Sequence, residues 1–246
     1  MLHKPTVFLS CLVVFALSLA DTAMAQGISL DFEDGGAFSA RVIQLLVLVT
    51  VLSLAPGIAI MITCFPFIVT VLAILRQGIG LQQSPPNMLI VSLALFLTYF
   101  VMEPIFVTAW ETGLLPLLEE QIPIDTAIER SLEPFRAFML TRVDPDTFAI
   151  MADLRVDTTQ TAPDVDAPLS ILVPSFMLSE IARAFQVGFL LFLPFLIIDL
   201  VVAAVLMSMG MMMVPPAVVS LPFKLAFFVV ADGWTLVADG LVRGYF

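Results

Sequence analysis

Histidine and cysteine are nearly absent from this 246-residue sequence: His3 is the single histidine, and Cys11 and Cys64 are the two cysteines. We expect His3 and Cys11 to be lost with a signal peptide. The remaining chain would then exclude Ser-His and Cys-His nucleophilic pairs, histidine-based zinc sites and intramolecular disulfides. We therefore expect a protein that is not an enzyme and that holds no metal or cofactor.

Charged residues are also scarce, at 13% of the chain, whereas 60% of the residues are hydrophobic. A soluble domain is roughly 45–50% apolar. The excess predicts a membrane protein or a subunit buried in a membrane-associated assembly. Because the apolar residues form long runs rather than short strands between turns, we expect an all-α fold of membrane-associated helical hairpins.

The first 25 residues have the pattern of a signal peptide. A basic start precedes an apolar run from Val7 to Ala20, and Ala23-Met24-Ala25 fits the small-x-small cleavage rule. We expect cleavage after Ala25, so that the mature chain begins at Gln26. The alternative is an uncleaved membrane helix, but the apolar run is shorter than the ~20 residues that a span needs.

Two prolines interrupt the first of the long apolar segments that follow. Val42–Leu75 is too long for one simple crossing and contains Pro56-Gly57 and Pro66, which predicts a broken or kinked helix. With Met88–Trp110 it would form a first apolar helical hairpin within residues 26–110. Residues 171–246 would form a second hairpin, from Ile171–Met213 and Ala217–Leu241. Hydropathy alone predicts four crossings.

The intervening stretch, residues 111–170, is acidic. From Glu111 to Pro168 there are twelve acidic residues and four arginines, a net charge of −8 out of −11 for the whole chain. This surface would repel a nucleic acid, so we expect no nucleic-acid partner.

Helical signals are present within this acidic stretch. Thr126-Ala127-Ile128-Glu129 has the spacing of a capping box, and Asp144-Pro145 is typical of a second helix start. The first of these helices would have one apolar face, made of Ile124, Ile128, Leu132, Phe135 and Phe138. The second would place Phe148 and Met151 on its inner face. We interpret residues 157–168 as a loop.

Several charged residues lie within or beside apolar segments, which lipid-facing helices do not tolerate. They are Glu103, Glu180, Arg183, Asp199, Lys224 and Asp232. Asp199 and Lys224 lie on opposite arms of the second hairpin, and we expect a structural pair, either with each other or across subunits, because an isolated buried ion is costly. The alternative is that each reaches water alone. Glu180 and Arg183 have the i,i+3 spacing of a local pair.

Methionines gather before the tip of the second hairpin. Met207, Met209, Met211, Met212 and Met213 are five methionines in seven residues, with Gly210 among them and Val214-Pro215-Pro216 directly after. The prolines predict a rigid tip. Methionine is unbranched and polarisable, so a ring of these side chains could seal a pore and still deform around a passing chain. The alternative is that they fill irregular gaps at a helix end.

A set of spaced motifs makes the second half of the chain specific. They are Pro174-Ser175-Phe176, Ser179-Glu180, Ala184-Phe185-Gln186-Val187-Gly188-Phe189, Pro194-Phe195-Leu196-Ile197-Ile198-Asp199, Gly210-Met211-Met212-Met213-Val214-Pro215-Pro216, Leu221-Pro222-Phe223-Lys224 and Asp232-Gly233-Trp234. In this order they resemble the FliP family of the flagellar export apparatus and its injectisome counterparts. Weaker agreement continues upstream, as at Pro85-Pro86-Asn87.

The resemblance implies a core pore-forming subunit of a type III protein export gate. Copies of FliP would assemble with FliQ and FliR into a closed helical ring through which unfolded flagellar proteins pass, next to FlhA and FlhB. The ring would belong to the flagellar basal body and lie largely on the periplasmic side of the bacterial inner membrane, in contact with lipid. The resemblance also favours the pore-gasket interpretation of the methionines. A signal peptide and an extended acidic region suit the flagellar branch better than an injectisome.

A function of a different class is an ion-coupled transporter, in which Glu103, Asp199 and Asp232 would form a proton relay. The sequence lacks the inverted repeat that would support this. A membrane enzyme has less support still, because no catalytic motif surrounds the carboxylates.

Overall fold

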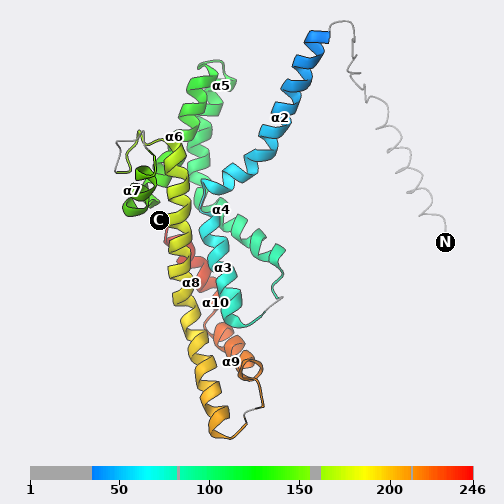
Figure 1. Cartoon of the computed structure of the whole chain (residues 1–246), viewed down its shortest axis with the longest axis vertical. Coiled ribbons are helices and arrows are strands. Elements are labelled where there is room, and N and C mark those ends of the chain that lie inside the picture. Colours follow the sequence, from blue (N-terminus) through cyan, green and yellow to red (C-terminus); the bar gives the residue numbers. More distant parts are fainter. Residues whose placement is uncertain (1–34, 82–83, 156–161, 212, 246) are drawn as a thin grey trace, which may run out of the picture. The chain divides into compact units, whose positions relative to one another are not determined.

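The computed structural model describes residues 35–81, 84–155, 162–211 and 213–245, and within these ranges the chain is helical and has no strand. This confirms the all-α prediction. The chain divides into two units, Met1–Ser53 and Leu54–Phe246. The expected signal peptide, Met1–Ala25, lies outside the described residues and stays a prediction. The helices of Figure 1 are α2 (Gly35–Met61), α3 (Phe65–Ile79), α4 (Asn87–Ala109), a π-helix (Trp110–Leu114), α5 (Leu115–Leu118), α6 (Ile124–Arg142), α7 (Pro145–Asp153), α8 (Leu169–Ser208), α9 (Pro216–Val230) and α10 (Gly233–Arg243).

The first long apolar run is broken, as predicted, and the break lies at Pro66. Helix α2 ends at Met61 and α3 begins at Phe65, with the proline in the first turn of α3. A proline is tolerated there because the first amides of a helix have no intrahelical acceptor. Pro56, by contrast, lies inside α2 and does not end it. Helix α3 ends at Ile79, and its C-cap Gly80 has a left-handed φ of 87°.

Helix α6 begins at Ile124 with Pro123 as its N-cap, so the capping box predicted at Thr126-Ala127-Ile128-Glu129 is wrong. The helix starts one turn earlier because Pro123 adopts an extended backbone, and this places Thr126 inside the first turn. The predicted apolar face is also only partly correct, because Ile124 and Ile128 are exposed. Ala127 and Met139 are the buried residues of α6.

Helix α7 begins as predicted. The Asp144 carboxylate accepts hydrogen bonds from the Thr147 amide at 2.9 Å and the Thr147 hydroxyl at 2.7 Å, and Pro145 occupies the first turn. Phe148 on the inner face is fully buried, and Met151 is half-buried.

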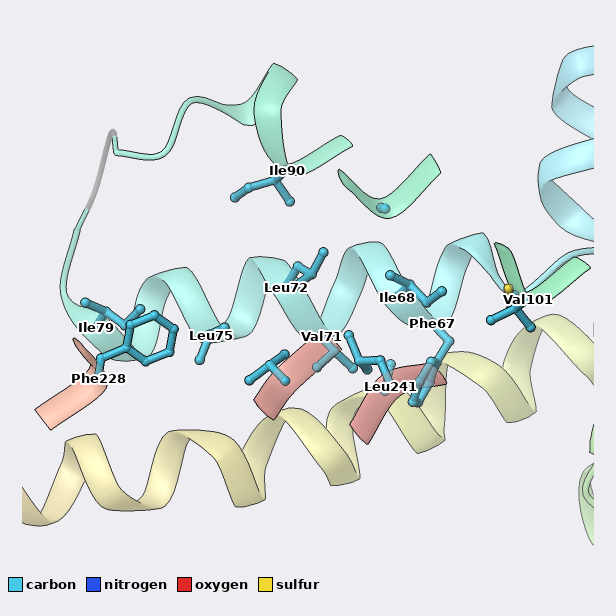
Figure 2. Packing of buried hydrophobic residues seen from close by; sticks show 14 of the residues in the cluster. Phe67, Ile68, Val71, Leu72, Leu75, Ile79, Ile90, Val101, Phe228 and Leu241 are labelled. Carbon is cyan, nitrogen blue, oxygen red and sulfur yellow. The ribbon is translucent and has the colours of Figure 1, made fainter. Parts of the chain in front are cut away.

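Helix α3 lies at the centre of the main core (Figure 2). Its buried residues recur every three to four positions, as one face of a helix requires. They are Phe67, Ile68, Val71, Leu72, Leu75 and Ile79, and they meet Ile90 and Val101 from α4, Phe228 from α9 and Leu241 from α10. The most extensive helix contact is between α3 and α8, where Gly188 of α8 allows Ile74 to approach closely. A second cluster, around Phe148 and Phe176, joins α6, α7 and α8.

Three helical stretches in the described part of the chain are long and apolar enough to cross a membrane: Arg41–Met61, Asn87–Leu118 and Leu169–Ser208. Helices α9 and α10 would add a fourth crossing if they act as one span, although they are bent by 62°. Both arms of the α8–α9 hairpin expose large apolar side chains, such as Leu200 and Val201 on α8 and Phe223 on α9. Such a surface requires lipid or neighbouring protein to cover it.

Candidate functional site

At the tip between α8 and α9, backbone hydrogen bonds cap the end of α8, and two prolines begin α9. The Gly210 amide donates to the Met207 carbonyl at 3.1 Å, and the Met211 amide donates to the Leu206 carbonyl at 3.0 Å. These two bonds define a Schellman motif, which needs a left-handed residue, and Gly210 supplies it with φ of 73°. Pro215 is the N-cap of α9, and Pro216 is its first residue.

The four described methionines of the tip are exposed in the single subunit. Met209 is 66% exposed and Met213 is 98% exposed, and Met207 and Met211 are exposed as well. Met212 lies outside the described residues. Met209 and Met211 also line an apolar groove of about 610 Å³ between α8 and α9, whose other walls include Val205 and Phe223. Exposure of 40% or more leaves a large part of each of these four side chains uncovered in the single subunit.

The structure brings Asp199 of α8 and Lys224 of α9 together. The Lys224 Nζ atom lies 2.6 Å from Asp199 Oδ2, within one subunit. The other carboxylate oxygen, Oδ1, accepts a hydrogen bond of 2.5 Å from the Ser220 hydroxyl. The ammonium also donates to the Gly78 carbonyl at 3.1 Å. Because Gly78 is in the last turn of α3, Lys224 places its positive charge at the negative end of that helix.

The two members of this pair differ in burial. The Lys224 side chain is 7% exposed, whereas the Asp199 side chain is 39% exposed. In the single subunit the carboxylate is therefore open to solvent in part, whereas the ammonium depends on its two protein partners. The pair joins three helices, α3, α8 and α9, at one point.

The second charge cluster surrounds Glu180 of α8, whose side chain is fully buried. Arg183 lies 3.4 Å from Glu180 Oε1, at the i,i+3 spacing noted in the sequence. Arg142, in the last turn of α6, lies closer: its Nε atom is 3.0 Å from the same oxygen. The Tyr245 hydroxyl donates to Oε2. A buried carboxylate thus has two cations and one hydroxyl donor, from three parts of the chain.

Arg142 and Tyr245 also contact each other, beside an aromatic cluster made of Tyr245, Phe67 and Phe138. The Arg142 guanidinium lies 4.1 Å from the centroid of the Tyr245 ring, within cation–π range. The same ring makes an edge contact with Phe67 of α3 and a stacked contact with Phe138 of α6. Arg142 Nη1 further donates to the Gly244 carbonyl at 2.8 Å.

Burial changes the acidity of two groups beside this cluster. It raises the pKa of the Tyr245 phenol, and the negative charge of Glu180 raises it further. Burial also raises the pKa of the Cys64 thiol to about 12. A thiolate is the nucleophilic form of cysteine, so Cys64 is inert at neutral pH.

Sequence reasoning missed Arg142 and Tyr245 as partners of Glu180. Arg142 is 38 residues from Glu180, and Tyr245 is 65 residues away. The available signal was a buried carboxylate in an apolar helix with one local cation, which indicates that a further donor is required. Nothing in the sequence says which residue supplies it. Across the described ranges, no group of three or more His, Cys, Asp or Glu residues could hold a metal ion.

Comparison with known proteins bears directly on this arrangement. The model of the FliP family matches residues 48–241, which include the tip and both charge clusters except Tyr245. The chain belongs to the FliP family. It is 50% identical over 238 residues to the flagellar biosynthetic protein FliP of Caulobacter vibrioides, covering 96% of this chain and 87% of that protein. It is 45% identical to the FliP proteins of Rhizobium meliloti, over 95% of this chain and 97% of that one, and Bacillus subtilis, over 82% and 91%.

FliP-family membership extends across almost the whole described chain, so the fold and the tip lie within the matched region. The family match confirms the resemblance inferred from the motifs between Pro174 and Trp234.

Proposed function

We propose that this chain is a core pore-forming subunit of the flagellar type III protein export gate, which passes unfolded flagellar proteins across the bacterial inner membrane. The observation that carries the proposal is the α8–α9 tip in a member of the FliP family. Its four described methionines are exposed, although methionine is an apolar residue that a subunit acting alone would bury.

In this proposal the methionines of several copies meet around the pore and form a gasket. The Schellman motif at Gly210 and the prolines at 215 and 216 hold each tip in one shape, while the side chains stay flexible. Unbranched side chains on a fixed backbone suit a seal that must exclude ions at rest and deform around polypeptides of varied sequence.

The two charge clusters have a structural role in the proposal. The Asp199–Lys224 pair would hold the arms of the hairpin to α3, and Glu180 with Arg183 and Arg142 would hold α8 to α6. No catalytic step is needed for passage through a pore.

The partners follow from the same proposal. Further FliP copies, FliQ and FliR would cover the exposed apolar faces of α8 and α9 together with membrane lipid, and FlhA and FlhB would lie beside the ring. The complex would belong to the flagellar basal body, largely on the periplasmic side of the inner membrane. The equivalent subunit of an injectisome is the alternative within the same class, and the names of the flagellar relatives favour the flagellar system.

The proton-relay alternative has less support. Asp199 is held by Lys224 and Ser220, and Glu103 and Asp232 are exposed rather than buried along a path.

Deletion of the gene separates these functions. The gate proposal predicts loss of flagellar filaments by microscopy and loss of export of flagellar proteins, with both restored by the intact gene. Co-purification of the restored protein with FliQ and FliR is the second readout. Normal filaments and export in the deletion strain would contradict the gate proposal, and activity of the chain as a solitary ion-coupled transporter would favour the relay.

A further inference from the structure

A sharp bend connects helix α10 to α9. The bend is 62°, and the residue at the bend, Asp232, has a left-handed backbone with φ of 49°. A non-glycine residue in this region is strained, and the surrounding structure must hold it there. Helix α10 contacts α4 and α9, and Val237 and Leu241 bury its inner face.

The segment directly after α10 lies in the aromatic cluster of Tyr245, Phe67 and Phe138, beside Glu180. Tyr245 lies two residues beyond the helix, and its hydroxyl donates to Glu180 Oε2. Arg142 of α6 contacts the same segment twice, because it donates to the Gly244 carbonyl and lies over the Tyr245 ring, and it also pairs with Glu180 of α8. The segment after α10 is therefore bonded to residues of α6 and α8.

We propose that Gly244 and Tyr245 form a latch that closes over Glu180 and fixes α10 onto α6 and α8, with Arg142 and Tyr245 as the positioning residues. The latch satisfies both oxygens of a carboxylate that water does not reach. It also makes the position of α10 depend on α6, which belongs to the acidic stretch of the chain. The inference concerns the conformation of one subunit and holds whether or not the export proposal is correct.

The chemistry of the latch explains why these residue types are present. Arginine offers a planar fork, so one side chain serves the carboxylate through Nε and the Gly244 carbonyl through Nη1, which a lysine ammonium does not reproduce. Tyrosine combines a ring that packs between Phe67 and Phe138 with a hydroxyl that donates to the second oxygen. A phenylalanine would keep the packing and leave Oε2 without this donor.

Replacing Tyr245 by phenylalanine tests the latch, and the sequence offers a matched control. Tyr99 and Tyr245 are its two tyrosines, and Tyr99 is exposed. The full chain is purified in detergent as Tyr245→Phe and as Tyr99→Phe, and hydrogen exchange of the α10 amides is measured in each. We expect at least about tenfold faster exchange in Tyr245→Phe, since a hydrogen bond to a charged group is among the stronger ones. Arg142→Lys should also accelerate exchange, whereas Arg243→Lys, which alters an exposed pair, should not.

A spectroscopic measurement tests the contact itself. In Tyr99→Phe the phenolate absorbance reports Tyr245 alone. The groups that face it are Glu180 of α8, Arg142 of α6 and the Cys64 thiol before α3. We expect the folded protein to titrate this phenol above the ordinary value of about 10. Exchange in Tyr245→Phe within twofold of Tyr99→Phe, or titration of Tyr245 at the ordinary value in the folded chain, would overturn the latch.

Discussion

The ammonium of Lys224 lies 2.6 Å from the carboxylate of Asp199, and the buried member of the pair is the lysine. Because Asp199 keeps access to water, the two single truncations should differ. Asp199→Ala leaves a buried ammonium with the Gly78 carbonyl as its partner, and we expect a loss of about 3–5 kcal/mol in the free energy of unfolding. Lys224→Met should cost less, since water can solvate the carboxylate that remains.

Thermal unfolding of the purified full chain measures both variants, and the double variant completes a mutant cycle. Losses that simply add would show that the residues do not interact. Asp239→Ala, which breaks the exposed Arg243–Asp239 pair, is the control and should leave the unfolding temperature unchanged. A greater loss in Lys224→Met than in Asp199→Ala would contradict the argument from burial.

The exposed methionines allow the gasket to be tested without harming the subunit. Met211, Met212 and Met213 changed together to alanine should leave the fold and the assembly intact, because Met211 and Met213, the two described side chains among them, are exposed and add little packing within the subunit. Cells with this variant should leak small ions yet retain some protein export. The leucine variant, of similar volume but stiffer, should leak less. Wild-type membrane conductance in an alanine variant that assembles normally would show that these are ordinary packing residues.

Replacing Gly210 should destabilise the chain because of the left-handed backbone at this position, and not because neighbouring atoms would clash with a side chain. Its φ is 73°, yet a Cβ atom built there meets nothing within 4 Å. Gly210→Ala should therefore destabilise the chain by about 1 kcal/mol through left-handed strain alone. Gly240 of α10 has equally open space and lies inside a helix, so Gly240→Ala should instead stabilise by roughly 0.5–1 kcal/mol. Thermal unfolding distinguishes the two, and equal shifts of the same sign would contradict this explanation.

Asp144 should make the start of α7 sensitive to acid. Its hydrogen bonds from the Thr147 hydroxyl and amide hold its pKa below the ordinary value. A lowered pKa contributes stability at neutral pH that is lost as the pH falls through the folded-state pKa. Asp144→Ala should therefore lower the unfolding temperature at pH 7, and the difference from wild type should shrink in acid. Asp144→Asn, which can still cap a helix, should lose less at pH 7. A difference that does not depend on pH would exclude the carboxylate as its cause.

Tyr245 should make the stability of the folded chain decrease at alkaline pH, whereas Asp144 makes it decrease in acid. A phenol with a raised pKa keeps its proton in the folded protein, whereas the unfolded chain loses it above about pH 10. Its contribution to stability is therefore complete below that pH and is lost as the pH rises further. We expect the unfolding temperature of wild type to approach that of Tyr245→Phe above about pH 10. Parallel curves for the two proteins would show that the phenol does not titrate on unfolding.

The sequence by itself determined the features that depend on near neighbours. The break near Pro66 and the cap at Asp144 each follow from one residue's backbone or side chain acting within a single turn. Helix α8, in contrast, ends at Ser208, before the end of the predicted apolar segment at Met213. The apolar runs likewise predicted two helical arms for the second hairpin, because burial or lipid contact requires continuous hydrophobicity along each arm. They did not predict the 62° bend that divides the second arm, Ala217–Leu241, into α9 and α10. The capping box at Thr126 failed for a local reason too, since Pro123 started the helix earlier.

Only the tertiary structure decided which distant residues satisfy the buried charges. The sequence indicated that Glu180 and Lys224 need partners, because an unpaired ion in an apolar interior is costly. It could not select Arg142 and Tyr245 for Glu180, or show that Lys224 is the buried member of its pair. Those choices depend on how α3, α6, α8 and α9 pack, and this packing joins groups up to 146 residues apart, such as the Lys224 ammonium and the Gly78 carbonyl, by one hydrogen bond.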